Sequence, residues 1–437
     1  MEDYSTVSRK TEEQLRKFPG GFSPHLSKPR LKFLGDMLYG VQAAGDVKLS
    51  EIARELRPGS GCSPKKKEER LSRHLAAEDL TGVVGGVVLA DARRYVDEDT
   101  LVVVDPTDLQ KRHARRMEGL SKVYDGSRGD VGEGFGYTGV MAVACTEGDR
   151  LVVPLHLSFW SKTEKGFTSD NDRVHEAIRA IAGATGSRGV YVYDRGGDDA
   201  KLFRLYRELG VDFIVRAVGS RKVRSWRRLG TVEEFARSCP MRYRDRVETE
   251  GVGGRRGFTI EYGVIPVRLD EDGLRDEVFH LVVVKPLGRC EEFPDMKPMM
   301  HLTTLAEDTS RRSLARVVNG YYRRWLVEET IRYLKQSYRL EDVRVMTLRS
   351  LRNMAAIVLA AAYFACVWLG RRVKRGLIVR ALLDMSQRMG RLGGFVCGAL
   401  AHGIRRAFVR GGRWRGLDVE EFPKIFDDRQ MLLDLSG

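Results

Sequence analysis

Two short runs of apolar, mostly β-branched residues each end in an aspartate, and they constrain the fold of this chain more than any other feature. Residues 101–104 lead into Asp105, and residues 189–193 lead into Asp194. Continuous apolar runs of this length are typical of strands buried on both faces of a sheet. The pattern predicts an α/β fold with an acid at the end of two buried strands. Because an aspartate there can also cap a following helix, each motif alone leaves both interpretations open.

A third acid lies in a segment with helical periodicity. Tyr321, Arg324, Glu328 and Lys335 are spaced by three, four and seven residues, so on one continuous helix they fall within an arc of about 60°. Many helix faces of this kind are surface salt-bridge ladders. Together with the two strand-end aspartates, however, Glu328 completes a set of three carboxylates. Such an all-oxygen set suits Mg²⁺ or Mn²⁺.

At these residues the chain resembles the DDE transposases of the bacterial and archaeal insertion-sequence-four group. The signature of that group is Tyr, two residues, Arg, three residues, Glu, six residues and Lys, and the helical segment matches it without a gap. Two weaker motifs stand in the expected order: Asp105 with Thr107, and Asp194-Arg195-Gly196 with Asp198. One departure is Gly197, where many members carry a bulkier residue. The resemblance spans residues 30–370.

The resemblance implies a metal-dependent enzyme that cleaves and joins DNA. It predicts cut-and-paste transposition, in which terminal inverted repeats are bound, the transposon ends are cleaved through a DNA hairpin, and the ends are joined to target DNA. Two Mg²⁺ or Mn²⁺ ions per active site would assist the chemistry, and a homodimer would assemble on the DNA. The implied catalytic and metal-binding residues are Asp105, Asp194 and Glu328. The implied phosphate-binding residues are Tyr321, Arg324 and Lys335.

Neighbouring residues leave three local alternatives. Asp108 could replace Asp105 as a ligand, but it stands three residues farther along the chain and is the weaker candidate. Glu329 points about 100° away from Glu328 on a helix and is not expected to be a ligand. Arg195 either contacts DNA or pairs with Asp198, and the pairing is preferred.

The composition favours a nucleic-acid partner. The formal net charge of +15 indicates a polyanion, nucleic acid before a membrane surface. The amino terminus lacks the apolar core of a signal peptide. Apolar residues 354–369 form too short a run to span a bilayer. Six cysteines without a Cys-x-x-Cys pair exclude a zinc ribbon, give no disulfide framework and fit a cytoplasmic location.

The periodicity divides the chain into a ribonuclease H-like catalytic core, a β-rich insertion and helical regions at both ends. We expect strands at 101–105, 137–145, 150–159, 189–194, 212–217, 257–269, 278–285 and 301–305. Helices are expected at 172–184, 199–209, 311–337 and 347–370. The expected domains are a helical DNA-binding domain (1–95), the first part of the core (96–217), the insertion (218–300), the second part of the core with the catalytic helix (301–370) and a basic helical region (371–437).

Two regions outside the core have basic faces suited to DNA. Residues 49–56 and the helix that follows resemble a helix-turn-helix, which makes Lys66 a candidate DNA contact. In the insertion, arginines surround Trp226, and Trp226 and Arg227 are candidates because rings stack on exposed bases. In both regions a merely solvated basic surface is the alternative.

The sequence is also compatible with two other functions. The first is a ribonuclease H-like nuclease or domesticated transposase that cuts DNA without joining it. The second is a non-enzymatic DNA-binding regulator, in which the three carboxylates would be dispensable.

Overall fold

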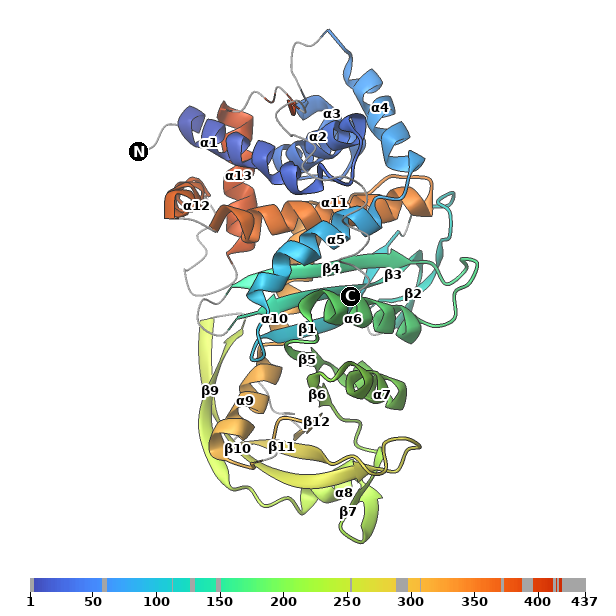
Figure 1. Ribbon diagram of the computed structural model, residues 1–437, viewed down its shortest axis with the longest axis vertical. Helices are drawn as coiled ribbons and strands as arrows, with labels where there is room; N and C mark the ends of the chain where they lie inside the picture. The colour runs from blue at the N-terminus through green and yellow to red at the C-terminus, as the bar shows by residue number, and fades with distance from the viewer. Residues whose placement is uncertain are drawn as a thin grey trace.

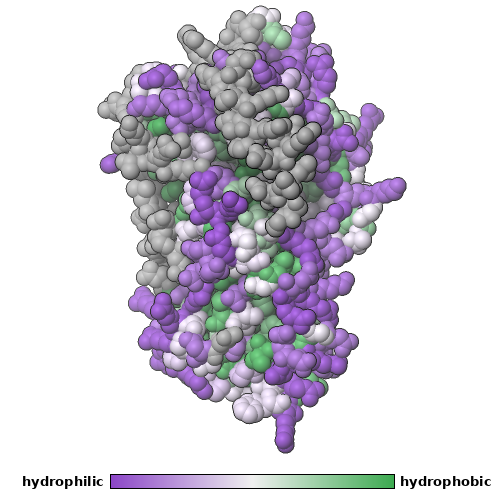
Figure 2. Space-filling model, in the orientation of Figure 1, coloured by the Kyte–Doolittle hydropathy of each residue, from purple (hydrophilic) through white to green (hydrophobic). Residues whose placement is uncertain are grey.

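The computed structural model describes residues 4–56, 61–111, 113–125, 130–146, 151–251, 254–287, 298–306, 308–370, 373–386, 396–411, 414 and 416–418. The molecule is elongated, with helices from both ends of the chain at one pole and the insertion strands at the other (Figure 1). Hydrophilic side chains dominate the face shown in Figure 2, with apolar patches in the half that holds the insertion strands.

One mixed sheet of 12 strands, counted over the described residues, runs through the molecule. The strands are β1 (Leu101–Gln110), β2 (Ser121–Asp125), β3 (Asp130–Cys145), β4 (Val152–Trp160), β5 (Val190–Tyr193), β6 (Asp212–Arg216), β7 (Lys222–Ser225), β8 (Arg228–Thr231), β9 (Tyr243–Gly251), β10 (Gly254–Leu269), β11 (Phe279–Leu287) and β12 (Met299–Thr303). Their order is β2-β3-β1-β5-β6-β12-β11-β10-β7-β8, with β4 beside β3 and β9 beside β10.

The first half of this sheet has the expected ribonuclease H-like arrangement. Strands β1, β3 and β4 pair antiparallel, whereas β5 and β6 run parallel to β1. The crossovers to the parallel strands pass through α6 (Asp170–Thr185) and α7 (Ala200–Leu209). The apolar residues 101–104 of β1 and all of β5 are buried, as their sequence predicts. The first and fourth strands of the core are therefore neighbours, and residues at their carboxyl ends meet.

The insertion does not form a sheet of its own. Strand β12 pairs antiparallel with β6, and β11 and β10 continue outward from it. Four strands are not predicted by the sequence: β2, β7, β8 and β9. Each is short or rich in polar residues, so its apolar pattern is too brief to identify, and its pairing depends on neighbours that are distant in sequence.

Helices from both ends of the chain cover the sheet beside β4. From the amino-terminal part come α1 (Tyr4–Lys17), α2 (Lys28–Ala44), α3 (Leu49–Glu55), α4 (Pro64–Ala77) and α5 (Thr81–Ala92), and from the carboxyl-terminal part come α11 (Leu348–Cys366), α12 (Val373–Met385) and α13 (Cys397–Gly411). Helix α11 is buried along almost its whole length. Its Asn353 accepts from the Leu80 amide at 2.7 Å and donates to the carbonyls of Leu75 and Glu78, which fastens the two groups of helices together. Among the described residues, no helix is long and apolar enough to cross a membrane.

Cys366 and Cys397 are joined by a disulfide, so the expectation of no disulfide was wrong. The two cysteines stand at the end of α11 and the start of α13. The packing of these helices brings their Cα atoms to 5.4 Å, a proximity that a separation of 31 residues does not reveal.

The predicted helix over 311–337 is interrupted. Helix α9 (Arg311–Tyr322) ends and α10 (Trp325–Ser337) begins across a tight turn. The Arg324 amide donates to the Tyr321 carbonyl at 3.0 Å, and the Val327 amide donates to the Arg324 carbonyl at 3.1 Å. These are i to i−3 bonds, which wind the chain more tightly than an α-helix. The four signature residues therefore do not share one continuous helical stripe, as the sequence alone had suggested.

Candidate active site

Strand register places the two aspartates side by side. The last parallel pair between β1 and β5 is Val103 with Val192. Asp105 and Asp194 each follow two residues later, so they lie level with one another and on the same face, because side chains alternate along a strand. Strand β1 was expected to end at Asp105, but it continues to Gln110. Its antiparallel pairing with β3 goes on after β5 has stopped.

Asp194 also has the capping role that the sequence left open. Its Oδ1 accepts from the Gly196 amide at 2.8 Å and so caps the short 3₁₀ turn Arg195–Gly197. A carboxylate has a second oxygen, so capping does not exclude binding a cation. The unusual Gly197 has a structural reason: a Cβ there would lie 2.1 Å from Cδ1 of Tyr193. The Tyr193 ring thus occupies the room that a bulkier residue 197 would need.

Arg324 joins the strand carboxylate to the helix carboxylate. Its Nη1 donates to Asp105 Oδ1 at 3.1 Å and its Nη2 donates to Glu328 Oε1 at 2.5 Å. Helix α10 packs on β1 and β3 and buries Val327. With Val327 buried, Arg324 and Glu328 face the end of the strand. The single positive charge of the guanidinium is shared between two carboxylates, one 219 residues earlier in the chain and one four residues later.

The electrostatics show that all three carboxylates share one region. Burial, opposed by the Arg324 guanidinium and aided by the negative charges of Asp194 and Glu328, raises the pKa of Asp105 to about 7. Burial disfavours the ionised carboxyl, and like charges add to that cost. A site that gathers three acids in this way favours a cation, and Arg324 supplies one in this structure.

Tyr321 is buried and does not face solvent. Its ring packs on His301, with 4.2 Å between ring centroids, and the Arg324 guanidinium lies 5.8 Å from its centre. With 7% of its surface exposed, little of the residue is available for DNA. The Tyr321 ring therefore supports one face of the Arg324 guanidinium.

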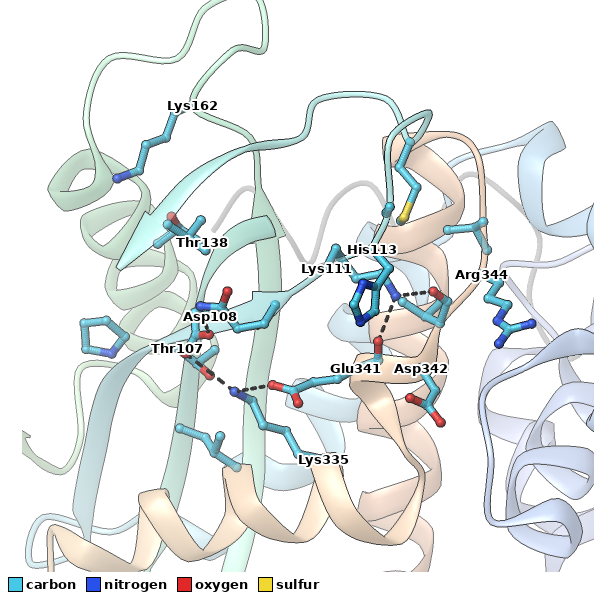
Figure 3. A pocket seen from close by; sticks show the side chains of 18 of the residues that line it. Thr107, Asp108, Lys111, His113, Thr138, Lys162, Lys335, Glu341, Asp342 and Arg344 are labelled. Carbon is cyan, nitrogen blue, oxygen red and sulfur yellow. Dashed lines mark hydrogen bonds and ion pairs between the residues drawn. The ribbon is translucent and has the colours of Figure 1, made fainter. Parts of the chain in front are cut away.

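Lys335 lies one to two turns beyond Glu328 and is also paired. Its Nζ lies 3.0 Å from Glu341 Oε1 and 3.5 Å from Asp108 Oδ1, and Figure 3 shows it pointing between these two acids. Asp108 also accepts from Gln110 at 2.8 Å. Asp108 is therefore engaged with a lysine and an amide and does not replace Asp105 beside Arg324.

These residues line one open cavity of about 1780 Å³. Besides the three carboxylates, Arg324 and Lys335, it has basic residues that the sequence analysis missed: Lys111, His113, Arg115, Arg116, Lys162 and Arg344. In Figure 3, Lys162 stands across the cavity from Arg344. The dense basic run at 111–116 was the available signal. An acidic centre with a basic rim suits a phosphodiester backbone.

A comparison with protein families identifies the family of this chain. Residues 97–364 match the transposase DDE domain, which is more than half of the chain. This chain belongs to the DDE transposase family. Among solved structures, it is similar to a piggyBac transposase in a synaptic complex with hairpin DNA, at 11% identity and a TM-score of 0.42, over 100% of this chain and 85% of that one. No curated protein matches.

Two loops of the transposase form the basic wall of the cavity. Lys111 Nζ donates to the carbonyls of Glu341 and Val343 at 2.7 and 2.5 Å, as Figure 3 shows. The Glu118 amide donates to the Met346 carbonyl, and the Leu348 amide donates to the Glu118 carboxylate, both at 2.9 Å. The segment after β1 is therefore held against the segment after α10, which fixes the wall beside Lys335.

The donor set fits a divalent cation, although it is not a closed metal site in this structure. Within the described ranges, no group of three or more acidic, histidine or cysteine side chains is close enough to hold a metal ion. The Arg324 guanidinium pairs with both Asp105 and Glu328. A cation already bridges these oxygens, and oxygen donors of this kind prefer Mg²⁺ or Mn²⁺.

Asp198 is a structural residue of the transposase, and the preferred pairing with Arg195 was wrong. The Asp198 carboxylate is fully buried, accepts from the Val218 amide at 2.5 Å and pairs with Arg221. Arg195 is exposed. Arg221 reaches Asp198 because its guanidinium extends from the start of the insertion across the ring of Phe203.

Asp198→Ala should lower the free energy of unfolding by about 3 kcal/mol, because it leaves Arg221 without its buried partner. Chemical denaturation followed by circular dichroism measures this. Asp272→Ala is the matched control, since that aspartate is 90% exposed in its pair with Arg275 and should matter little. Equal losses in the two variants would show that the buried pair has no special role.

The remaining predicted DNA contacts lie outside the cavity. Lys66 is exposed on α4, in the helical layer above the sheet (Figure 1). Trp226 and Arg227 form the turn between β7 and β8, at the opposite pole of the molecule. Glu329 is turned toward Arg332.

Proposed function

We propose that this transposase is a cut-and-paste enzyme of the insertion-sequence-four type, which binds terminal inverted repeats, cleaves the transposon ends and joins them to target DNA. The observation that carries the proposal is the Arg324 bridge. It unites the acid of β1 with the acid of α10 beside Asp194, within a cavity that has a basic rim.

The three carboxylates are proposed to hold two Mg²⁺ or Mn²⁺ ions. Asp105 and Asp194 would present oxygens from the sheet, and Glu328 from the helix that packs across it. Bound ions of this kind supply an activated oxygen nucleophile and stabilise the leaving oxygen of a phosphodiester. The chain provides the fixed scaffold, because two of the acids stand on adjacent strands in register.

The signature cations are proposed to exchange partners when DNA enters. Arg324 now binds two carboxylates, and Lys335 binds Glu341 and Asp108. In the complex, Arg324 would turn its planar guanidinium to a phosphate in bidentate fashion, and Lys335 would act as a point charge. Tyr321 would be a positioning residue for Arg324, since its ring is buried beneath the guanidinium.

The later steps rest on the signature rather than on the cavity. Members with these four residues free a 3′-hydroxyl that attacks the opposite strand and closes a hairpin on the transposon end. We infer the same course here, with a homodimer assembled on the two ends and the reaction taking place on cytoplasmic DNA. Lys66 on α4 is proposed to contact the terminal repeat.

A strand-transfer assay tests this function against its alternatives. Duplexes that carry the inverted repeats beside the gene are incubated with the protein, Mg²⁺ and a supercoiled target plasmid. The proposal expects cleaved ends, a hairpin intermediate on denaturing gels and joined products. Cleavage without joined products would favour a nuclease or domesticated enzyme, and binding without cleavage would favour a regulator.

A further inference from the structure

The hairpin formed by β7 and β8 ends in a tryptophan that folding does not explain. Ser225 pairs with Arg228, so Trp226 and Arg227 form a two-residue turn. Trp226 is 92% exposed and has φ of 53°. Hairpins usually place glycine at such a position, because a side chain there is strained. The positive φ costs stability and the exposed ring contributes no burial to offset it, so its presence points to a use outside the fold.

Like charges face one another between β7 and its other neighbour, β10. Strand β7 alternates exposed Lys222 and Arg224 with buried Val223 and Ser225. Arg224 stands directly opposite Arg268 of β10, and both are exposed. Like charges in cross-strand positions repel. An anion placed between the two guanidinium groups would remove that repulsion.

The charge around the turn is of one sign. Residues 220–231 contain five arginines and lysines, all within 221–228, and no acid. Arg221 is occupied by Asp198 and Glu271, and Arg228 stacks on Phe235 at 5.2 Å. Of the five basic residues, Lys222, Arg224 and Arg227 remain. We name Arg224, Trp226, Arg227 and the cross-strand Arg268, whose Nη1 also donates to the Asp276 carbonyl, the hairpin cluster. The arginines of the cluster suit the phosphates of a nucleic-acid backbone, and the Trp226 ring suits the bases beside them.

The hairpin cluster is separate from the catalytic cavity. None of its members lines that cavity. In Figure 1, β7 and α8 (Val232–Arg237) lie at the pole farthest from the amino-terminal helices, and α10 lies between these two ends. A Trp226 ring at this place cannot serve the phosphate held beside Arg324 in the same protomer.

We propose that the hairpin cluster is a second DNA-binding surface, which grips duplex DNA away from the cleaved phosphate. Arg224 and Arg268 bind backbone phosphates, and Trp226 wedges against a base step, as apolar side chains do in bent duplexes. The inference goes beyond end cleavage: it assigns to the insertion the task of holding a further stretch of the duplex.

Binding of a labelled duplex of about 40 base pairs, roughly 140 Å long, tests the surface by fluorescence anisotropy. Trp226→Ala should weaken binding about 5- to 100-fold. Arg224→Gln combined with Arg268→Gln should weaken it and reduce the slope of log affinity against log salt by about two. Arg237→Gln is the matched control, because that arginine is exposed on α8 but paired with Glu233. Trp226→Gly, which relieves the positive φ, should lose binding without lowering Tm.

A second readout locates the contact. In protein labelled with 5-fluorotryptophan, the ¹⁹F resonance of Trp226 is assigned by its loss in Trp226→Phe. It should shift on addition of the duplex, also in Glu328→Gln protein that cannot cleave, so failure of catalysis and failure of this surface are distinguishable. Full binding with an unmoved Trp226 resonance would overturn the proposal. So would a resonance that responds to protein concentration without DNA, which would indicate contact between protomers.

Discussion

Glu328→Gln is expected to reduce cleavage of transposon ends by about 10³-fold or more, with binding of the ends unchanged within about threefold. The substitution keeps the shape of the side chain and its hydrogen bond to Arg324, but it removes the charge that a metal ion requires. End binding depends on the basic surfaces of the chain, which this change does not touch. Single-turnover cleavage of an end-repeat duplex and anisotropy of the same duplex measure the two effects.

Glu329→Gln is the matched control for that experiment. It alters the next residue of the same helix, whose carboxylate is turned toward Arg332. Cleavage by this variant should stay within about threefold of the parent chain. If both glutamine variants lose activity equally, the effect belongs to the helix rather than to the carboxylate, and the assignment of Glu328 is wrong.

Arg324→Ala is expected to have the second-largest effect. It should lower the stability of the protein even without DNA. At pH 8 and without metal, the variant should melt about 2–4 °C below the parent chain. Removing the guanidinium leaves Asp105 and Glu328 facing one another unpaired, a loss of about 2 kcal/mol because Glu328 is partly exposed. Cleavage should also fall by about 10²-fold, since a phosphate ligand is lost.

Metal should restore the melting temperature of this variant. In the Arg324→Ala protein, Mn²⁺ can occupy the place of the guanidinium, so its stabilising effect should exceed that in the parent chain. Arg332→Ala removes an arginine from the same helix and from a pair remote from the cavity, and its response to Mn²⁺ should match the parent. If the Arg324→Ala protein is as stable as the parent without metal, the ion pairs of Arg324 with the two acids do not contribute to stability.

The sequence was sufficient for the two buried strands that lead to Asp105 and Asp194. Continuous apolar runs predicted buried β1 and β5 with an aspartate after each run, and the parallel pairing of these strands in the structure places Asp105 and Asp194 side by side. These features are local, or follow from one topology. The same local logic predicted α6, α7 and the buried α11, because their apolar periodicity spans several turns.

The misses share a physical cause: each depends on contacts between distant segments. The break between α9 and α10 follows directly after Tyr321, which packs on His301, and helical periodicity does not encode a contact of this kind. The partner of Asp198 comes from the insertion, 23 residues away. Lys111 reaches carbonyls more than 200 residues farther along the chain. The internal pairing of Arg324 and Lys335 was likewise invisible, because the pattern shows charges without their partners.

Counting bound Mn²⁺ tests the central claim most directly. Free Mn²⁺ is measured by electron paramagnetic resonance during titration of the protein on an uncleaved end-repeat duplex, for the parent chain and for the variant with Asp105→Asn, Asp194→Asn and Glu328→Gln together. The account predicts about two more ions per chain in the parent complex than in the variant, since the duplex contributes equally to both. Identical Mn²⁺ binding by the two complexes would contradict the assignment of these three carboxylates as the metal site.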